Sequence, residues 1–439
     1  MEILRNKEIK KMWILNAGYD STWQNDRCGV RKFKDKNEQI MFNRMAELFL
    51  FLANKDDIVY VVDNPDEDFL EDMKLLGFDI PLFKKVPEEN MTISEILFNN
   101  KDLIYNQLDD MHEYLYMPYI VTKYDEEIVS HKQLKLYGTS SDIVEKINNK
   151  ILTRKIISDM GLPIIDGYTC SDSEEVQNGY NNLKSMGYSK YAIKEPYNSA
   201  GKGVYYIHNE RQFNNFLKMI RFPQDVDNFQ VAIEGWIDNK RDINYQIEIK
   251  PNGDVDLLAI SEQIVSITSY KGSMYPAQIS HEQEVCYKEY AQKIGQKLFS
   301  MGYIGIIGID SIIDENGKII PAIEFNARLN QSTLYLPMLE LFENKHKKTS
   351  IRSFDIRTKS KITYSKLKEL LVGYNLYFDS RSNEGIIILN SACLSPYQIG
   401  EDNLYHSRVF FASIYDENTD FVAQNNKLEK MIRKIEKVS

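Results

Sequence analysis

Three side chains that could handle a metal-bound nucleotide alternate along the extended apolar segment 323–328. Glu324, Asn326 and Arg328 occupy every second position there, so a β-strand would point all three the same way. A carboxylate and an amide provide the hard oxygen ligands that suit Mg²⁺, and an arginine can bind an oxyanion that forms during a reaction. The segment therefore predicts chemistry on nucleotide phosphates.

A second carboxylate, Asp310, lies in the preceding apolar run, 305–313. The two runs are joined by the turn 314–317, which ends in Asn-Gly, a strong hairpin signal between β-branched segments. If the runs pair across this turn, Asp310 and Glu324 face one another and can hold a metal between them. The alternative is a plain hairpin with carboxylates at a solvated edge. Both acids lie inside apolar runs, where an unpaired charge is costly, and this favours the metal site.

A lysine and a glycine-containing loop precede this hairpin. The segment 191–196 is predicted to be a strand that delivers Lys194 at its end, and the loop 198–204 follows it. Such a loop can present backbone N–H groups to phosphate oxygens. Alone it is weak evidence, because many such stretches are ordinary turns, and it lacks the ending of a P-loop.

A candidate nucleoside site comes next along the chain. The predicted strand 229–237 ends in Glu234, Gly235, Trp236 and Ile237, an acid and bulky apolar residues that could form a slot for adenine with free backbone groups at its edge. Asp242 follows within reach of a ribose.

The elements that must position these residues alternate between strands and helices. Strands over 12–17 and 57–63 flank a helix over 37–53, which predicts a βαβ unit and a small Rossmann-like domain over 1–137. The chemistry-bearing domain is predicted over 138–345, opened by a helix over 149–161. A small α+β domain over 346–439 has a helix near Leu367, two strands and a last helix that ends near Lys437.

Composition excludes several classes of protein. The chain has 439 residues, a formal net charge of -10 and a pI near 5.4, which argues against nucleic-acid and membrane-surface partners. Four cysteines are scattered without paired spacing, which predicts free thiols rather than a zinc site or disulfides. The longest apolar run, 48–52, is too short to cross a bilayer and no signal-peptide pattern precedes it, so we expect a cytoplasmic protein.

Taken in order, these motifs resemble the ATP-grasp superfamily of carboxylate ligases. The resemblance implies an α/β fold of that type, with a Rossmann-like pre-ATP-grasp domain before it and a small α+β domain after it. It further implies ATP and two Mg²⁺ ions as cofactors. The implied nucleotide-binding residues are Lys150 and Lys194 for phosphates, Ser199, Gly201 and Gly203 in a flexible lid, Glu234, Trp236 and Ile237 for adenine, and Asp242 for ribose.

The same resemblance assigns the reaction centre. Asp310, Glu324 and Asn326 would hold the metal ions, Arg328 would lie by the acyl phosphate, and Lys202 in the lid would be catalytic. Gly308 departs from relatives such as the D-alanine ligases, which have an arginine two residues before the metal-binding Asp. D-Alanine ligation is therefore disfavoured, and Arg328 becomes more necessary.

The flanking segments are similar to those of the pheganomycin-type peptide ligases and of the butirosin-pathway ligase that loads glutamate onto an acyl carrier protein. This resemblance implies specialised metabolism, in which an amino-acid carboxylate is activated as an acyl phosphate and passed to a carrier-protein thiol or an amine, with release of ADP and phosphate. A peptide-bond-forming ligase and a non-catalytic nucleotide-binding module remain as alternatives. A homodimer is common in the family.

Two further segments have open interpretations. The stretch 266–276, with hydroxyls and Lys271, suits either a substrate loop or a plain surface loop. A basic cluster near 345–361 could dock an acidic carrier protein, although a solvated linker is favoured. The cluster consists of Lys345, Lys347, Lys348, Arg352, Arg357, Lys359 and Lys361.

Overall fold

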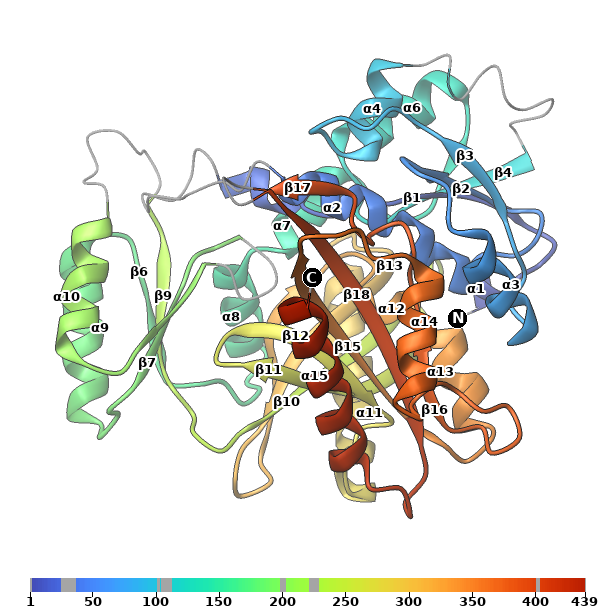
Figure 1. The fold of residues 1–439 in the computed structure, drawn as a ribbon. Coiled ribbons are helices and arrows are strands. Elements are labelled where there is room, and N and C mark those ends of the chain that lie inside the picture. Colours follow the sequence, from blue (N-terminus) through green and yellow to red (C-terminus); the bar gives the residue numbers. More distant parts are fainter. Residues whose placement is uncertain are drawn as a thin grey trace.

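The computed structural model describes residues 2–24, 37–100, 103, 113–197, 203–220, 229–399 and 403–438. These residues form three sheets with helices packed against them (Figure 1). No helix within these ranges combines the length and the apolar character needed to cross a membrane.

The first sheet is parallel and five-stranded, in the order β3-β2-β1-β4-β5, which confirms the predicted Rossmann-like N-terminal part. The helix predicted over 37–53 consists of two helices in succession, the α-helix α2 and the 3-10 helix η2. The strands are β1 (Lys10–Ile14), β2 (Ile58–Val61), β3 (Leu82–Lys85), β4 (Tyr114–Pro118) and β5 (Lys135–Leu136). The helices are α1 (Glu2–Arg5), η1 (Tyr19–Gln24), α2 (Glu38–Arg44), η2 (Met45–Phe51), α3 (Glu67–Leu75), α4 (Ile93–Asn99) and α6 (Lys123–Lys132).

A smaller body, on the left of Figure 1, consists of a four-stranded antiparallel sheet in the order β6-β9-β7-β8 with two helices. It has a hydrophobic cluster of its own, which includes Leu183, Ile193 and Phe213. Its elements are β6 (Gly167–Cys170), α9 (Ser173–Ser185), β7 (Tyr191–Lys194), β8 (Val204–Ile207), α10 (Glu210–Met219) and β9 (Val231–Gly235).

The third sheet has nine antiparallel strands and carries the hairpin with the predicted metal ligands. Its order is β14-β13-β10-β11-β12-β15-β18-β16, and β17 also pairs with β18. The strands are β10 (Arg241–Ile249), β11 (Val255–Ser266), β12 (Ser269–Tyr275), β13 (Gly305–Ile313), β14 (Ile319–Asn326), β15 (Lys348–Thr358), β16 (Gly385–Ile388), β17 (Tyr397–Ile399) and β18 (Leu404–Tyr415). The helices around it are α7 (Ser141–Ile147), α8 (Lys150–Asp159), α11 (His281–Ser300), α12 (Gln331–Leu334), α13 (Leu336–Glu343), α14 (Tyr364–Gly373) and α15 (Phe421–Val438).

The basic cluster is not a linker, and that prediction is wrong. Most of its length is strand β15, paired with β12 and β18 along the sheet. Lys347 binds the carboxylates of Glu384 and Asp416 at 2.7 and 3.2 Å, and Arg352 binds Glu429 at 3.0 Å. Because acids distant in sequence pair with these cations, the charge run that suggested a solvated segment is compatible with an ordered strand.

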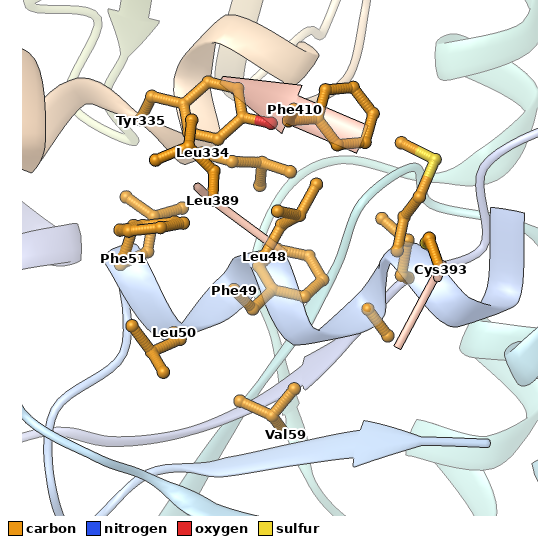
Figure 2. Close-up of a cluster of buried hydrophobic side chains, with 14 of the residues drawn as sticks. Leu48, Phe49, Leu50, Phe51, Val59, Leu334, Tyr335, Leu389, Cys393 and Phe410 are labelled. Carbon is orange, nitrogen blue, oxygen red and sulfur yellow. The ribbon is translucent and has the colours of Figure 1, made fainter. Parts of the chain in front are cut away.

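The N-terminal part and the tail share one hydrophobic core. Helix η2 lies between Val59 of β2 on one side and Tyr335 and Phe410 on the other (Figure 2). All seven residues of η2 are buried, and the rings of Phe51 and Tyr335 have centroids 5.7 Å apart. The strands of the tail therefore help to hold the N-terminal domain in place.

A buried carboxylate links the same two parts of the chain. Glu47 of η2 is fully buried and accepts hydrogen bonds from Ser391 N and Oγ, at 2.8 and 2.7 Å, and from Ala392 N at 2.7 Å. Burial raises the pKa of Glu47 to about 7, despite these three donors and the nearby Arg44. The folded protein thus binds the Glu47 proton more tightly than the unfolded chain does.

This linkage predicts a pH-dependent loss of stability. The contribution of Glu47 is fully present below pH 4.5 and is lost as the pH rises towards 7, at a cost of about 3 kcal/mol. We expect urea unfolding to show that the free energy of unfolding of the natural chain falls between pH 5 and pH 8. In Glu47→Gln the fall between the same two pH values should be smaller by about this amount. The same pH slope in both proteins would contradict the assignment.

Candidate active site

The hairpin β13–β14 brings the predicted metal ligands together. Asp310 and Glu324 are direct partners across its ladder, as predicted. The turn is held by Asp314, whose Oδ1 accepts hydrogen bonds from Asn316 N and Lys318 N at 2.9 Å each, and by Gly317 at φ +82°, a conformation that glycine adopts without strain. The local sequence thus fixes the register that places two acids side by side.

Asp310 is held by three side-chain amides. Asn244 Nδ2, Gln263 Nε2 and Asn326 Nδ2 donate to its carboxylate at 2.8, 2.9 and 3.1 Å. Burial, with the charge of Glu324 beside it, raises the pKa of Asp310 to about 6. The two carboxylates are oxygen ligands that suit a hard cation such as Mg²⁺, and Asn326 could add its amide oxygen if its amide turned over, since its Nδ2 faces Asp310 here. Among the described residues no group of three or more His, Cys, Asp or Glu side chains is placed to hold a metal ion, and this site supplies two such acids.

Lys150 lies in the same site, at the first residue of α8. Its Nζ is 2.9 Å from Glu324 Oε1 and its side chain is 3% exposed, so a solvated helix face is excluded. The helix begins there because Asn149 caps it, accepting from Ile151 N at 2.9 Å and Leu152 N at 3.2 Å. A buried cation therefore faces one of the candidate metal ligands.

Lys194 and Glu234 form a second buried ion pair. Lys194 Nζ lies 2.7 Å from Glu234 Oε2, and Arg154 Nη1 lies 3.0 Å from Glu234 Oε1. Arg154 also donates to the carbonyl oxygens of Ile165 and Gly167 at 2.7 and 2.6 Å. Although burial acts in the opposite direction, these two cations hold the pKa of Glu234 below its usual value. The side chain of Glu234 is thus engaged within the protein, and the residues after it face the cleft.

Trp236 and Asp242 line the cleft with a cation between them. Lys240 contacts Asp242 Oδ1, and its Nζ lies 5.2 Å from the centroid of the Trp236 ring. The ring of Tyr206 also packs against Trp236, and the centroids of the two rings are 4.7 Å apart. Lys240 was not singled out by sequence analysis, although its place between Trp236 and Asp242 was visible there.

Arg328 is buried at the junction with the N-terminal part. Its Nη2 donates to Asn326 Oδ1 at 2.8 Å and its Nη1 to Asn330 Oδ1 at 3.1 Å. The Tyr119 hydroxyl is 3.3 Å from Nη1, and Asp20 Oδ2 is 3.4 Å from Nε. The guanidinium is thereby fixed beside the hairpin acids.

The backbone of Gly308 makes room for this arrangement. A Cβ built on Gly308 would lie 1.5 Å from Asn330 Nδ2, so Asn330 fills the space beside this glycine. Asn330 is itself buried and holds Arg328.

We expect Gly308→Ala to destabilise the protein by about 1–3 kcal/mol, because it overfills a packed site. The matched control is Gly373→Ala at the end of α14, where no atom lies within 4 Å of the new Cβ; it should be neutral or stabilising by up to about 1 kcal/mol. Thermal melts of both variants test this. If removal of the Asn330 side chain, in Asn330→Ala, failed to lessen the effect of Gly308→Ala, the steric explanation would be wrong.

One cleft unites most of the predicted residues. It encloses about 1610 Å³ of empty space, part of it open to solvent, and extends from the small body to the N-terminal part. The predicted residues that line it are Lys194, Glu234, Trp236, Ile237, Asp242, Asp310, Glu324, Asn326 and Arg328. Lys150 joins them through Glu324.

The lid is largely outside the described residues. Ser199, Gly201 and Lys202 fall there. Gly203 is described, and its carbonyl oxygen accepts from Glu195 N at 2.9 Å. The segment 266–276 is mostly strand β12, so it is not a loop of either predicted kind. Its hairpin tip at Ile267 and Thr268 lines the cleft, and a role in substrate binding stays a prediction.

Several cleft residues escaped the sequence analysis. Asn244 lies on β10, which pairs with the hairpin strand β13, and Gln263 lies on β11, the next strand along the sheet. A polar residue between apolar ones at Asn244 was the available signal. Asp20 and Tyr119 come from the N-terminal part, more than 200 residues before Arg328. Their role follows from tertiary contacts that no local pattern encodes.

Comparison with known proteins gives the family. Residues 173–326 match the family described as L-aspartate–L-methionine ligase, ATP grasp. The chain is also 32% identical, over 338 residues, to the [butirosin acyl-carrier protein]–L-glutamate ligase of Niallia circulans, covering 76% of this chain and 75% of that protein. The chain belongs to the ATP-grasp family of ligases.

Solved structures support the ATP-grasp fold. Biotin carboxylase from Campylobacter jejuni, in a complex with an ATP analogue, has a TM-score of 0.56 at 14% identity, covering 98% of this chain and 92% of that one. N5-carboxyaminoimidazole synthetase from Staphylococcus aureus, complexed with ADP, has a TM-score of 0.52 at 13% identity, covering 89% and 94%. This ATP-grasp ligase is thus an ADP-forming enzyme that ligates a carboxylate at the expense of ATP, as predicted. ATP and Mg²⁺ are the general cofactors of its family.

Proposed function

We propose that this ATP-grasp ligase activates the carboxylate of an amino acid as an acyl phosphate and transfers it to an acyl-carrier-protein thiol or to an amine, in specialised, antibiotic-type metabolism in the cytoplasm. ADP and phosphate are released. The observation that carries the proposal is the direct pairing of Asp310 with Glu324 in one cleft with Arg328. The similarity to a ligase named for butirosin acyl-carrier protein and glutamate supports the acceptor and the pathway class.

The phosphate end of the cleft would bind ATP through two lysines. Lys150 and Lys194 are held by Glu324 and Glu234 respectively, and in the complex they would turn to the phosphate oxygens. Asp310, Glu324 and Asn326 would hold Mg²⁺, two ions in the full arrangement, which would offset the charge of the phosphates. Trp236 and Ile237 would enclose adenine, and Asp242 would meet the ribose.

The acyl end of the cleft would be served by Arg328. Its guanidinium is fixed by Asn326, Asn330 and Tyr119, so it can stabilise the acyl phosphate and the tetrahedral oxyanion without moving. Closure of the lid, with Ser199, Gly201, Lys202 and Gly203, would exclude the water that hydrolyses an acyl phosphate.

The test is ADP and phosphate release with ATP, Mg²⁺ and a panel of amino acids, with and without a phosphopantetheinylated carrier protein. A mass gain on the carrier that depends on one amino acid would support the thioester-forming reaction. ADP release that needs only a free amine, with the carrier unmodified, would make the enzyme a peptide-bond-forming ligase. If no pairing gave ATP turnover, the proposal would fall in favour of a nucleotide-binding module.

A further inference from the structure

The cleft continues past Arg328 into the N-terminal part, where one acid lies. Asp20, on η1 after strand β1, lines the cleft and is buried. Its Oδ2 is 3.4 Å from Arg328 Nε, and both side chains are 10% exposed. An acid and a guanidinium thus stand side by side in the wall of a substrate cleft.

Such a pair matches the two charges of an α-amino acid. The carboxylate of the amino acid can bind the guanidinium, whose planar fork suits that group, and the ammonium can bind the neighbouring acid. A bound zwitterion would place its carboxylate on Arg328 and its ammonium on Asp20, so both buried charges would stay compensated.

Part of the wall near Asp20 is apolar, although Gln331 and Ser332 also line the cleft. Leu15, Phe42, Met45 and Leu334 line this end of the cleft. The Phe42 ring lies against Gly18, two residues before Asp20, since a Cβ on Gly18 would come within 2.9 Å of Phe42 Cδ2. Among the described residues that line the cleft, the other cations are Lys194 and Lys240, which lie with the nucleotide-binding residues Glu234 and Asp242.

We infer that Asp20 binds the ammonium of the amino-acid substrate and that Leu15, Phe42, Met45 and Leu334 receive an apolar side chain. This inference rests on the proposed function and narrows its substrate to an α-amino acid with an apolar side chain. The substrate carboxylate then lies on Arg328, beside the acids of the hairpin, where it would be phosphorylated. Asp20 is then a specificity residue.

The test compares leucine, glutamate and 4-methylpentanoate, which is leucine without its ammonium group. In the natural chain with ATP and Mg²⁺, we expect kcat/KM for leucine to exceed that for glutamate by about tenfold or more. In Asp20→Asn, the preference for leucine over 4-methylpentanoate should fall by about tenfold or more, mainly through a higher KM for leucine. Phe42→Ala should reduce the preference for leucine over alanine.

Two results would overturn the inference. One is a preference of the natural chain for glutamate. The other is an equal loss with leucine and 4-methylpentanoate in Asp20→Asn, because an acid that only positions Arg328 would affect both compounds alike.

Binding is measured separately, by calorimetric titration of leucine into the natural chain and both variants without turnover. If no carboxylate supports ADP release, the proposed function fails, and the titration still decides this inference. The inference is supported if leucine binds about tenfold more weakly to Asp20→Asn than to the natural chain. It is rejected if leucine does not bind the natural chain, or if it binds the natural chain and Asp20→Asn equally. If Asp20→Asn does not fold, Phe42→Ala decides the inference by the same comparison of leucine with alanine.

Discussion

Replacement of Glu324 by alanine is expected to lower the rate of ATP-dependent ADP release by about 100- to 1000-fold, while the protein stays folded. Glu324 lies opposite Asp310 in the hairpin, and its carboxylate also holds Lys150 at 2.9 Å. Its loss would remove a metal ligand and misplace a cation that should meet the phosphates. The hairpin itself is retained, because the turn at Asp314 and the strand ladder do not use this side chain.

The matched control is Glu315→Ala in the exposed turn of the same hairpin. It removes one carboxylate from the same motif but leaves the cleft untouched, so ADP release should match that of the natural chain. Circular dichroism and thermal melts of both variants check folding. Undiminished ADP release in a folded Glu324→Ala variant would eliminate the metal assignment.

The largest effect on stability is expected from Glu234→Ala. The variant leaves Lys194 and Arg154 without the carboxylate that both cations contact at 3.0 Å or less, in a place where the three side chains are 7–13% exposed. Removal of one partner from a buried ion pair costs about 3–5 kcal/mol, because the remaining charge is left uncompensated. The free energy of unfolding should fall by that amount.

Chemical denaturation of this variant and a surface control tests the expectation. The control is Glu210→Ala on α10, whose partner Lys184 lies 3.3 Å away with both side chains more than half exposed. A surface pair of this kind contributes about 0–1 kcal/mol. If both variants lost the same free energy of unfolding, burial would not make the Glu234 ion pair more important for stability than the surface pair.

The pairing of the two hairpin acids was predictable because its geometry is local. Alternation along 323–328 and the Asn-Gly turn place Glu324 opposite Asp310 without any help from distant residues. Lys150 was harder to place, since a lysine at a helix start is ordinarily solvated; only the order of the motifs suggested its role.

Contacts over long sequence distances set the limit of prediction. The basic cluster looked like a charged linker because Asp416 and Glu429, which pair with its Lys347 and Arg352, lie 69 and 77 residues further on. Asp20 could not be connected with Arg328 for the same reason. A single sequence shows which residues carry charge, but not which ones meet.

The shared core of η2 and the tail bears on how the chain is made. Phe49 and Phe51 near the N-terminus are enclosed with Leu389 and Phe410 (Figure 2), and β18 lies inside the large sheet between β15 and β16. The N-terminal sheet and η2 therefore leave the ribosome long before the strand that covers them has been synthesised. The nascent chain must carry exposed apolar surface until β18 has been synthesised, a period in which chaperones would matter most.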